Sequence, residues 1–151
     1  MLRMSKLTDY GTLVLSQLAV NGVAPSSAGA VAGETHIAQP TVSKLLKALT
    51  RSGLVVSTRG AQGGYALARS PDEITAAEII DALEGPVAIT ECSADSGACG
   101  LEAWCSVGSA WQRINLSIRK ALQQITLADL QHRPRPMAPP DLKAGLKSSH
   151  N

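Results

Sequence analysis

The 151-residue sequence contains no phenylalanine, and aromatic residues make up only 3% of it. The core must therefore be built from Leu, Val, Ile and Ala, in a chain that is 44% hydrophobic. No apolar run reaches the roughly 18 residues that a membrane-spanning helix needs, and the first residues show no signal-peptide pattern. We therefore expect one globular domain in the cytoplasm, with no membrane partner.

Each of three consecutive parts of the chain carries mostly charges of one sign, with few or none of the other. Residues 1–70 carry seven Lys or Arg and two acids, residues 71–110 carry eight acids and no base, and residues 111–151 carry seven bases and two acids. A basic first half is typical of a protein that binds a polyanion. The acidic middle is not expected to contact phosphate.

Apolar residues recur at helical spacing in residues 5–20, which predicts a first helix. Ser26 and Ser27 are candidate N-caps for a short second helix that reaches about residue 34. A third helix is expected to carry Pro40 in its first turn and to end at Gly53. Its polar and basic outer face makes the last two helices a candidate helix-turn-helix, although an ordinary pair with a solvated face gives the same pattern.

A β-hairpin is predicted directly after the third helix, with strands at residues 54–58 and 65–68 and a glycine-rich turn between them. This order is that of a winged helix, with Arg59 supplying charge at the tip of the wing. The turn lacks the Lys-Ser/Thr pair of a nucleotide-binding P-loop. We predict DNA contacts from the start of the third helix and from the wing, namely Gln39, Pro40, Thr41, Ser43, Lys44, Lys47, Arg59 and Gln62.

The second half of the sequence predicts one short and one long helix. Thr75 is expected to cap the short helix, which Gly85 and Pro86 end. From residue 107 to 125, apolar residues recur at steps of four and three, as in a two-stranded helical seam through which two copies could pair. Thr126 caps a closing helix at residues 127–131, and the polar, proline-rich residues 132–151 are expected to be a disordered tail.

The predicted fold class is therefore mainly α with a small β-wing: a winged helix-turn-helix domain plus a long C-terminal dimerisation helix. Residues 1–84 form the DNA-binding domain, residues 85–106 a cysteine loop, residues 107–131 the dimerisation and closing helices, and residues 132–151 the tail.

All three cysteines, Cys92, Cys99 and Cys105, lie within fourteen residues of one polar loop. An odd count argues against a disulfide framework, and in the cytoplasm such a cluster indicates metal binding more than disulfide formation. Thiolates select zinc, copper(I) or iron–sulfur clusters, and a redox thiol pair is a further alternative. No base lies near the cysteines in sequence and no substrate-pocket motif is present, so we expect neither an enzyme nor a small-molecule substrate.

The sequence resembles the IscR/NsrR-type winged-helix regulators that sense iron–sulfur clusters. The resemblance covers residues 1–131 and rests on four stretches: the opening Met-Leu-Arg-Met-Ser-Lys-Leu-Thr-Asp-Tyr, the wing Arg-Gly-Ala-Gln-Gly-Gly-Tyr, the three-cysteine loop, and the closing Ile-Thr-Leu-Ala-Asp-Leu. The opening is similar to the branch that regulates the SUF iron–sulfur assembly operon.

The resemblance implies a homodimeric regulator, acting as a repressor at a palindromic operator in double-stranded DNA. It also implies an iron–sulfur cluster on Cys92, Cys99 and Cys105, with [2Fe-2S] favoured over [4Fe-4S]. The sequence lacks the histidine that follows the third cysteine in the IscR branch, whereas Asp9 matches the aspartate ligand of the NsrR branch. A zinc-stabilised regulator without redox sensing and a nitric-oxide-sensing repressor are the alternatives.

Overall fold

The computed structural model describes residues 4–89 and 107–131. Its described elements, in chain order, are α1 (Lys6–Asn21), α2 (Ala28–Thr35), α3 (Gln39–Arg51), β1 (Val55–Thr58), β2 (Gly64–Leu67), the short 3₁₀ helix η1 (Pro71–Glu73), α4 (Ala76–Glu84), α5 (Gly108–Gln123) and α6 (Leu127–Gln131). The sheet is a two-stranded antiparallel hairpin in which Val55 pairs with Leu67 and Thr58 with Gly64. The predicted fold class, mainly α with a small β-wing, is confirmed, and η1 is the one described element that the sequence reading omitted.

Helix ends follow the capping residues that the sequence offers. The Ser27 hydroxyl accepts a hydrogen bond from the Ala30 amide at 3.1 Å, which starts α2. Thr75 starts α4 in a capping box, because its hydroxyl accepts from the Glu78 amide while the Glu78 carboxylate accepts from the Thr75 amide. Such boxes satisfy backbone donors that a helix start leaves without partners.

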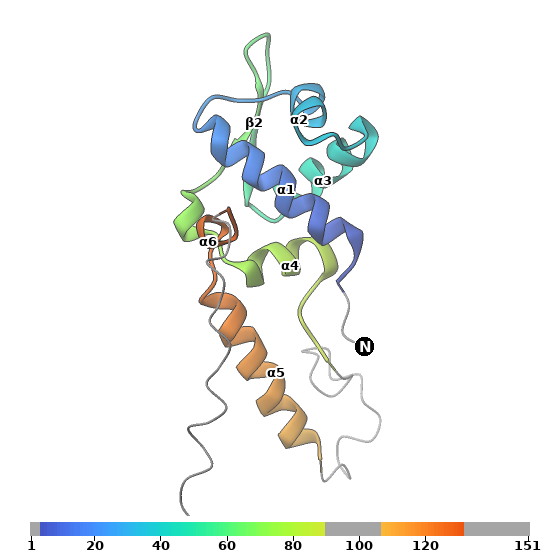
Figure 1. The fold of residues 1–151 in the computed structure, drawn as a ribbon, viewed down its shortest axis with the longest axis vertical. Helices are drawn as coiled ribbons and strands as arrows, with labels where there is room; N and C mark the ends of the chain where they lie inside the picture. The colour runs from blue at the N-terminus through green and yellow to red at the C-terminus, as the bar shows by residue number, and fades with distance from the viewer. Residues whose placement is uncertain (1–3, 90–106, 132–151) are drawn as a thin grey trace, which may run out of the picture.

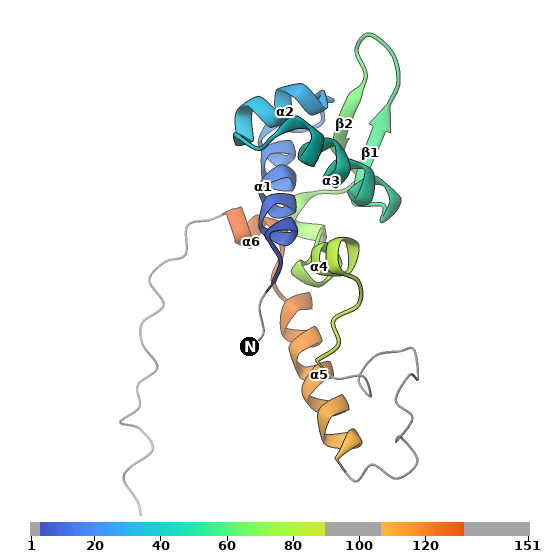
Figure 2. The same ribbon diagram turned by 90° about the vertical axis from the view of Figure 1, so that its right-hand side faces the viewer.

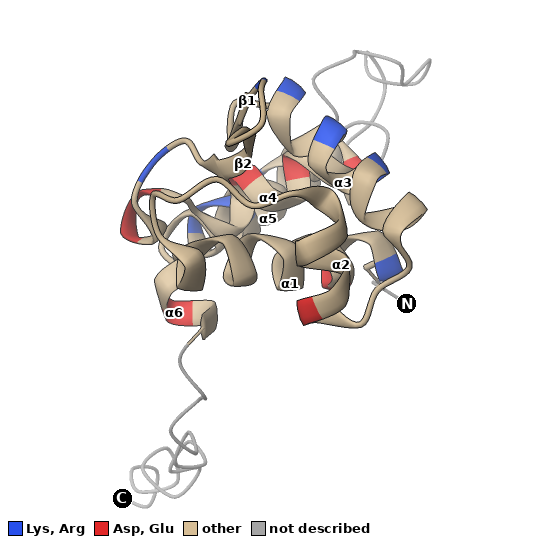
Figure 3. Ribbon diagram, turned by 90° about the horizontal axis from the view of Figure 1, so that it is seen from above, with Lys and Arg blue, Asp and Glu red and all other residues tan. Residues whose placement is uncertain are grey.

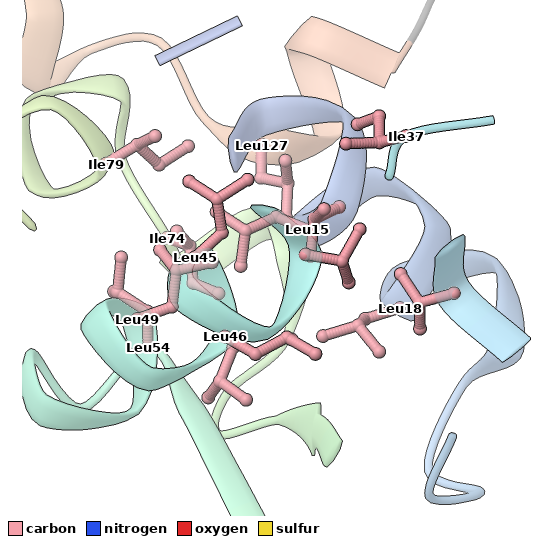
Figure 4. Close-up of a cluster of buried hydrophobic side chains, with 14 residues drawn as sticks. Leu15, Leu18, Ile37, Leu45, Leu46, Leu49, Leu54, Ile74, Ile79 and Leu127 are labelled. Carbon is pink, nitrogen blue, oxygen red and sulfur yellow. The ribbon is translucent and has the colours of Figure 1, made fainter. Parts of the chain in front are cut away.

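The core lies where α1, α3, the hairpin and η1–α4 meet (Figures 2 and 4). It is aliphatic, as the absence of phenylalanine predicts. Its fully buried members include Val14, Leu15, Leu18, Val31, Val42, Leu45, Leu46, Leu49, Leu54, Ile74, Ile79 and Leu127.

Leu127 brings the C-terminal part of the chain into this core (Figure 4). The Leu127 amide donates to the Ile74 carbonyl at 2.8 Å, and the Ala76 amide donates to the Ile125 carbonyl at the same distance. These two bonds attach the segment between α5 and α6 to the start of α4.

Helix α5 extends away from the rest of the molecule (Figures 1 and 2). Near the C-terminal end of α5, the Arg119 guanidinium forms an ion pair with the Asp81 carboxylate of α4 at 2.6 Å. The rest of the helix leaves large apolar side chains in solvent, including Trp111 at 39% and Ile114 at 43% exposure. Among the described residues, no helix is both long and apolar enough to cross a membrane.

Candidate DNA-binding surface and cysteine loop

Helix α3 has two chemically different faces. Val42, Leu45, Leu46 and Leu49 are buried against the core, at the spacing of one helical stripe. The opposite face carries its lysines and arginine, and in Figure 3 these positions lie along one edge of the molecule beside the hairpin. The acidic positions of α2 and α6 lie toward the other edge.

The structure places the eight predicted DNA-contacting residues on α3 and at the end of the hairpin. Six are exposed, and Thr41 and Ser43 are half-buried. Within the described ranges, no carboxylate forms an ion pair with Lys44, Lys47 or Arg59. Their charges are therefore available to an external anion. The six exposed residues are Gln39, Pro40, Lys44, Lys47, Arg59 and Gln62.

The turn between α2 and α3 is tight. His36 ends α2 in the left-handed conformation with φ +57°, a conformation that costs a residue with a Cβ atom on the order of 1 kcal/mol. Buried Ile37 follows, and Ala38 then caps α3 without a side-chain hydrogen bond. This turn fixes α3 on α2 and leaves the N-terminal end of α3 at the surface, which is the end that contacts bases in helix-turn-helix docking.

The wing is anchored to the start of α2. Ser26 and Tyr65 exchange two backbone hydrogen bonds, from the Ser26 amide to the Tyr65 carbonyl at 2.9 Å and from the Tyr65 amide to the Ser26 carbonyl at 2.8 Å. At the tip, the Gly63 amide donates to the Gly60 carbonyl and closes the turn. The wing therefore has a fixed orientation relative to the helix-turn-helix.

The three cysteines of the predicted cluster, Cys92, Cys99 and Cys105, lie outside the described residues. Asp9, the fourth predicted ligand, occupies the first turn of α1 and is exposed. No described residue forms a hydrogen bond or ion pair with its carboxylate. Within the described residues, 4–89 and 107–131, no three potential metal ligands lie close enough together to hold a metal ion.

Asp9 lines an open apolar pocket of about 510 Å³ to which α1, α4, α5 and α6 contribute residues. Helix α1 contributes Leu13, α4 contributes Ile79 and Ile80, and α5 contributes Leu122. Asp9 is exposed and also lines this pocket, so it borders both solvent and apolar surface.

Sequence reasoning missed three contacts that position these elements. Glu84 binds the start of α1, Asp81 binds Arg119, and Ser26 pairs with Tyr65. The eight-acid run contained both carboxylates, but periodicity does not show which acid meets which partner. The Ser26–Tyr65 pairing left no pattern in the sequence because it involves only backbone atoms.

Fold and surface together define a winged helix-turn-helix protein of the DNA-binding class. The chain belongs to the Rrf2 family, described as iron-dependent transcriptional regulators, whose model matches residues 4–133. It is similar to the HTH-type transcriptional regulator CymR of Bacillus subtilis, with 34% identity over 85% of this chain and 89% of that protein. It is also 30% identical to the HTH-type transcriptional regulator IscR of Cereibacter sphaeroides, over 91% of this chain and 94% of that one.

Solved structures agree with this assignment. The structure of CymR, titled the global cysteine regulator of B. subtilis, superposes with a TM-score of 0.65 at 33% identity, over 87% of this chain and 97% of that one. T. potens IscR superposes with a TM-score of 0.62 at 34% identity, over 85% of each chain. The family resemblance read from the sequence is confirmed, and the protein is a DNA-binding transcription regulator rather than an enzyme.

Proposed function

We propose that this regulator binds a palindromic operator as a homodimer in the cytoplasm and represses transcription according to the state of an iron–sulfur cluster in its cysteine loop. The observation that carries the DNA-binding part is the basic outer face of α3, free of described carboxylate partners and set beside an anchored wing. Its regulated genes, by resemblance to the SUF branch, are those of iron–sulfur cluster assembly.

Binding to a promoter fragment tests the DNA surface directly. Arg59→Ala is expected to weaken binding on all sequences, because a wing-tip arginine contacts phosphate or the minor groove. Lys44→Ala is expected to cost about 1–3 kcal/mol and to change operator preference if the lysine contacts a base. Lys120→Ala, on α5, is the matched control and should leave affinity unchanged. Unchanged binding by both Arg59→Ala and Lys44→Ala would rule out this surface.

The seam along α5 supports the homodimer. Its apolar positions are Val107, Trp111, Ile114, Ile118, Leu122 and Ile125, and Val107, Trp111, Ile114 and Ile125 are exposed in the single chain. A stripe of this length and period buries well against a second copy of itself.

Two substitutions by glutamate on α5 distinguish a dimer interface along the seam from a surface that is merely exposed. Ile114 is 43% exposed and lies on the seam, whereas Leu116 is 64% exposed and lies off it. We expect Ile114→Glu to produce monomers in analytical ultracentrifugation and Leu116→Glu to remain dimeric. Equal effects of the two changes would mean that the seam is not the interface.

The donor set suits an iron–sulfur cluster. Cys92, Cys99 and Cys105 supply three thiolates, and the exposed Asp9 carboxylate supplies a harder, more labile fourth ligand. The loop connects α4 to α5, the helix through which we propose that two copies pair. Asp9 therefore binds either the cluster of its own chain or the cluster of the partner copy. When bound, the cluster supplies sensitivity to oxidants, nitric oxide or iron shortage. Zinc, which accepts the same ligands without redox chemistry, is the alternative occupant.

The visible spectrum of anaerobically purified protein distinguishes these occupants, because an iron–sulfur protein is brown and a zinc protein is colourless. Asp9→Ala is expected to leave folding intact and to shorten the lifetime of the cluster, and Asp9→Cys to retain a cluster with a shifted spectrum. An Asp9→Ala protein with the wild-type spectrum and lifetime would show that Asp9 is no ligand.

Cluster-loaded and cluster-free protein are expected to differ in operator affinity by about 1–3 kcal/mol, the usual size of such coupling. Equal affinities on every promoter tested would leave the cysteine loop with a structural role only.

A further inference from the structure

The first turn of α1 is held by a single carboxylate at the end of α4. The Oε1 atom of Glu84 accepts hydrogen bonds from the Ser5 amide at 3.0 Å, from the Ser5 hydroxyl, and from the Thr8 hydroxyl at 2.5 Å. Ser5 is also the N-cap of α1, since its hydroxyl accepts from the Leu7 amide. One oxygen therefore binds both the cap and the first turn of the helix.

The chemistry of this contact favours the charged carboxylate. Hydrogen bonds from Ser5, then from Thr8, lower the pKa of Glu84. The positive end of the α1 dipole also favours an anion at this position. The donors are neutral hydroxyls and an amide rather than a cation, so the contact depends on geometry more than on net charge, and it is lost when the two helix ends separate.

Tight packing lies behind the carboxylate. A Cβ atom added to Gly11 of α1 would lie 2.3 Å from the Cδ1 atom of Leu83, so the two helices approach as closely as a glycine allows. Leu15 and Leu18, farther along α1, pack in the core with leucines of α3. A displacement at the end of α4 would therefore be passed through α1 to α3, the recognition helix of the helix-turn-helix, as rigid packed elements transmit motion.

The position of Glu84 in the chain is the second part of the argument. It is the last residue of α4, and Gly85 follows with φ +91° and ends the helix. The chain then continues toward Cys92. Thr8, which donates to Glu84, is the neighbour of Asp9. Glu84 thus lies between the entrance of the cysteine loop and the helical turn that carries the predicted fourth ligand.

We propose that Glu84 is a positioning residue that couples the cysteine loop to the recognition helix, through its hydrogen bonds to Ser5 and Thr8. The proposal rests on the state-dependent DNA binding proposed above. It adds the route: one state of the loop keeps Glu84 on the first turn of α1, and the other releases it. Without this contact, α3 no longer responds to the state of the loop.

The test compares operator affinity of the cluster-loaded and cluster-free forms in full-length variants. Glu84→Ala removes the acceptor, and the double variant Ser5→Ala, Thr8→Val removes the hydroxyl donors while leaving Glu84 in place. Glu34→Gln is the matched control, an exposed glutamate in α2 that accepts a hydrogen bond from Asn21. We expect the wild-type ratio of affinities, on the order of 5- to 150-fold, to fall toward one in both test variants and to persist in the control.

Amide hydrogen exchange, measured on the cluster-free and the cluster-loaded proteins, gives a readout that does not depend on DNA binding. In the state that keeps the contact, Glu84→Ala should accelerate exchange in the first turn of α1 and leave Leu15 and Leu18 protected; in the other state it should change little. Faster exchange along the whole helix would indicate general destabilisation, and the double variant then decides. If wild type shows a ratio above one and Glu84→Ala and the double variant both keep it, the coupling role is overturned while sensing stands. A wild-type ratio of one overturns sensing itself, and the coupling with it.

Discussion

Replacing Gly64 by alanine should detach the wing from the body of the protein. A Cβ atom at this position would lie 2.7 Å from the carbonyl carbon and oxygen of Ser26, and backbone atoms there cannot move aside cheaply. The neighbouring Tyr65 makes both hydrogen bonds to Ser26. Each such bond contributes about 0.5–1.5 kcal/mol net, so loss of the pair is expected to cost about 1–3 kcal/mol.

A matched glycine separates this loss from the cost of the backbone conformation. Gly64 has φ +155° and Gly60, at the wing tip, has φ +113°, but a Cβ atom on Gly60 meets nothing within 4 Å. Gly60→Ala therefore carries only a backbone penalty, of about 1–3 kcal/mol. Gly64→Ala carries a penalty of that kind and the lost anchor as well.

The measurement is urea unfolding at 25 °C followed by circular dichroism, together with operator binding. We expect the free energy of unfolding to be lower for Gly64→Ala than for Gly60→Ala by about 1–3 kcal/mol, the value of the two hydrogen bonds. Operator affinity should also fall further for Gly64→Ala, because a detached wing no longer presents its tip. Equal unfolding free energies for the two variants would refute the idea that the contact with Ser26 anchors the wing.

Three further changes test other parts of the structure. Leu127→Ala should destabilise the protein by about 2–5 kcal/mol in urea unfolding, because this C-terminal leucine is fully buried in the core of the DNA-binding part; a cost below about 1 kcal/mol would mean that α6 is only loosely attached. Gly33→Ala should raise stability by up to about 1 kcal/mol, since position 33 is exposed within α2 and an added Cβ meets nothing within 4 Å. Hydrogen bonds from Ser5 and Thr8 lower the pKa of Glu84 below its ordinary value of 4.5, so the stabilising effect of the Glu84 carboxylate is complete above that pH and is lost as the pH falls below it. The difference in urea midpoint between wild type and Glu84→Gln should therefore shrink between pH 5 and pH 3. A constant difference would contradict this.

Local patterns in the sequence were sufficient to predict the described helices and strands other than η1. The aliphatic stripe of α3, the caps Ser27 and Thr75, and the glycines around the wing each act over a few residues, so they locate an element without knowledge of its neighbours. The second predicted strand, residues 65–68, lies one residue beyond the observed β2, Gly64–Leu67, since alternation of apolar residues marks the middle of a strand better than its ends.

The contacts between elements could not be predicted in the same way. Asp81 and Arg119 are 38 residues apart, and Glu84 and Ser5 are 79 apart. Many acids and bases in the sequence could have paired at such separations, and a single sequence contains no signal that selects among them. The role of Asp9 stays a prediction for the same reason: its place on α1 followed from the helix pattern, whereas its partners depend on how α1 lies relative to the cysteine loop.

Helix α4 has an importance out of proportion to its nine residues, because it supports both α1 and α5. At its start, the Ala76 amide binds the Ile125 carbonyl beyond the end of α5. In its middle, Asp81 holds Arg119 of α5. At its end, Glu84 holds the first turn of α1.

The cysteine loop connects the end of α4 to the start of α5, so any force from the loop acts on α4 and on the N-terminal end of α5, the helix that α4 supports. The angle between α3 and α5 then depends on α4 remaining attached at all three points. In a dimer joined through α5, that angle sets the separation of the two recognition helices, and half-sites about one helical turn apart tolerate little change in it. Weakening the middle attachment by Arg119→Gln should therefore relax the preference for operator half-site spacing without removing contacts to DNA. Operators with one base pair added to or deleted from the centre provide the measurement, and an unchanged spacing preference would place control of the angle outside α4.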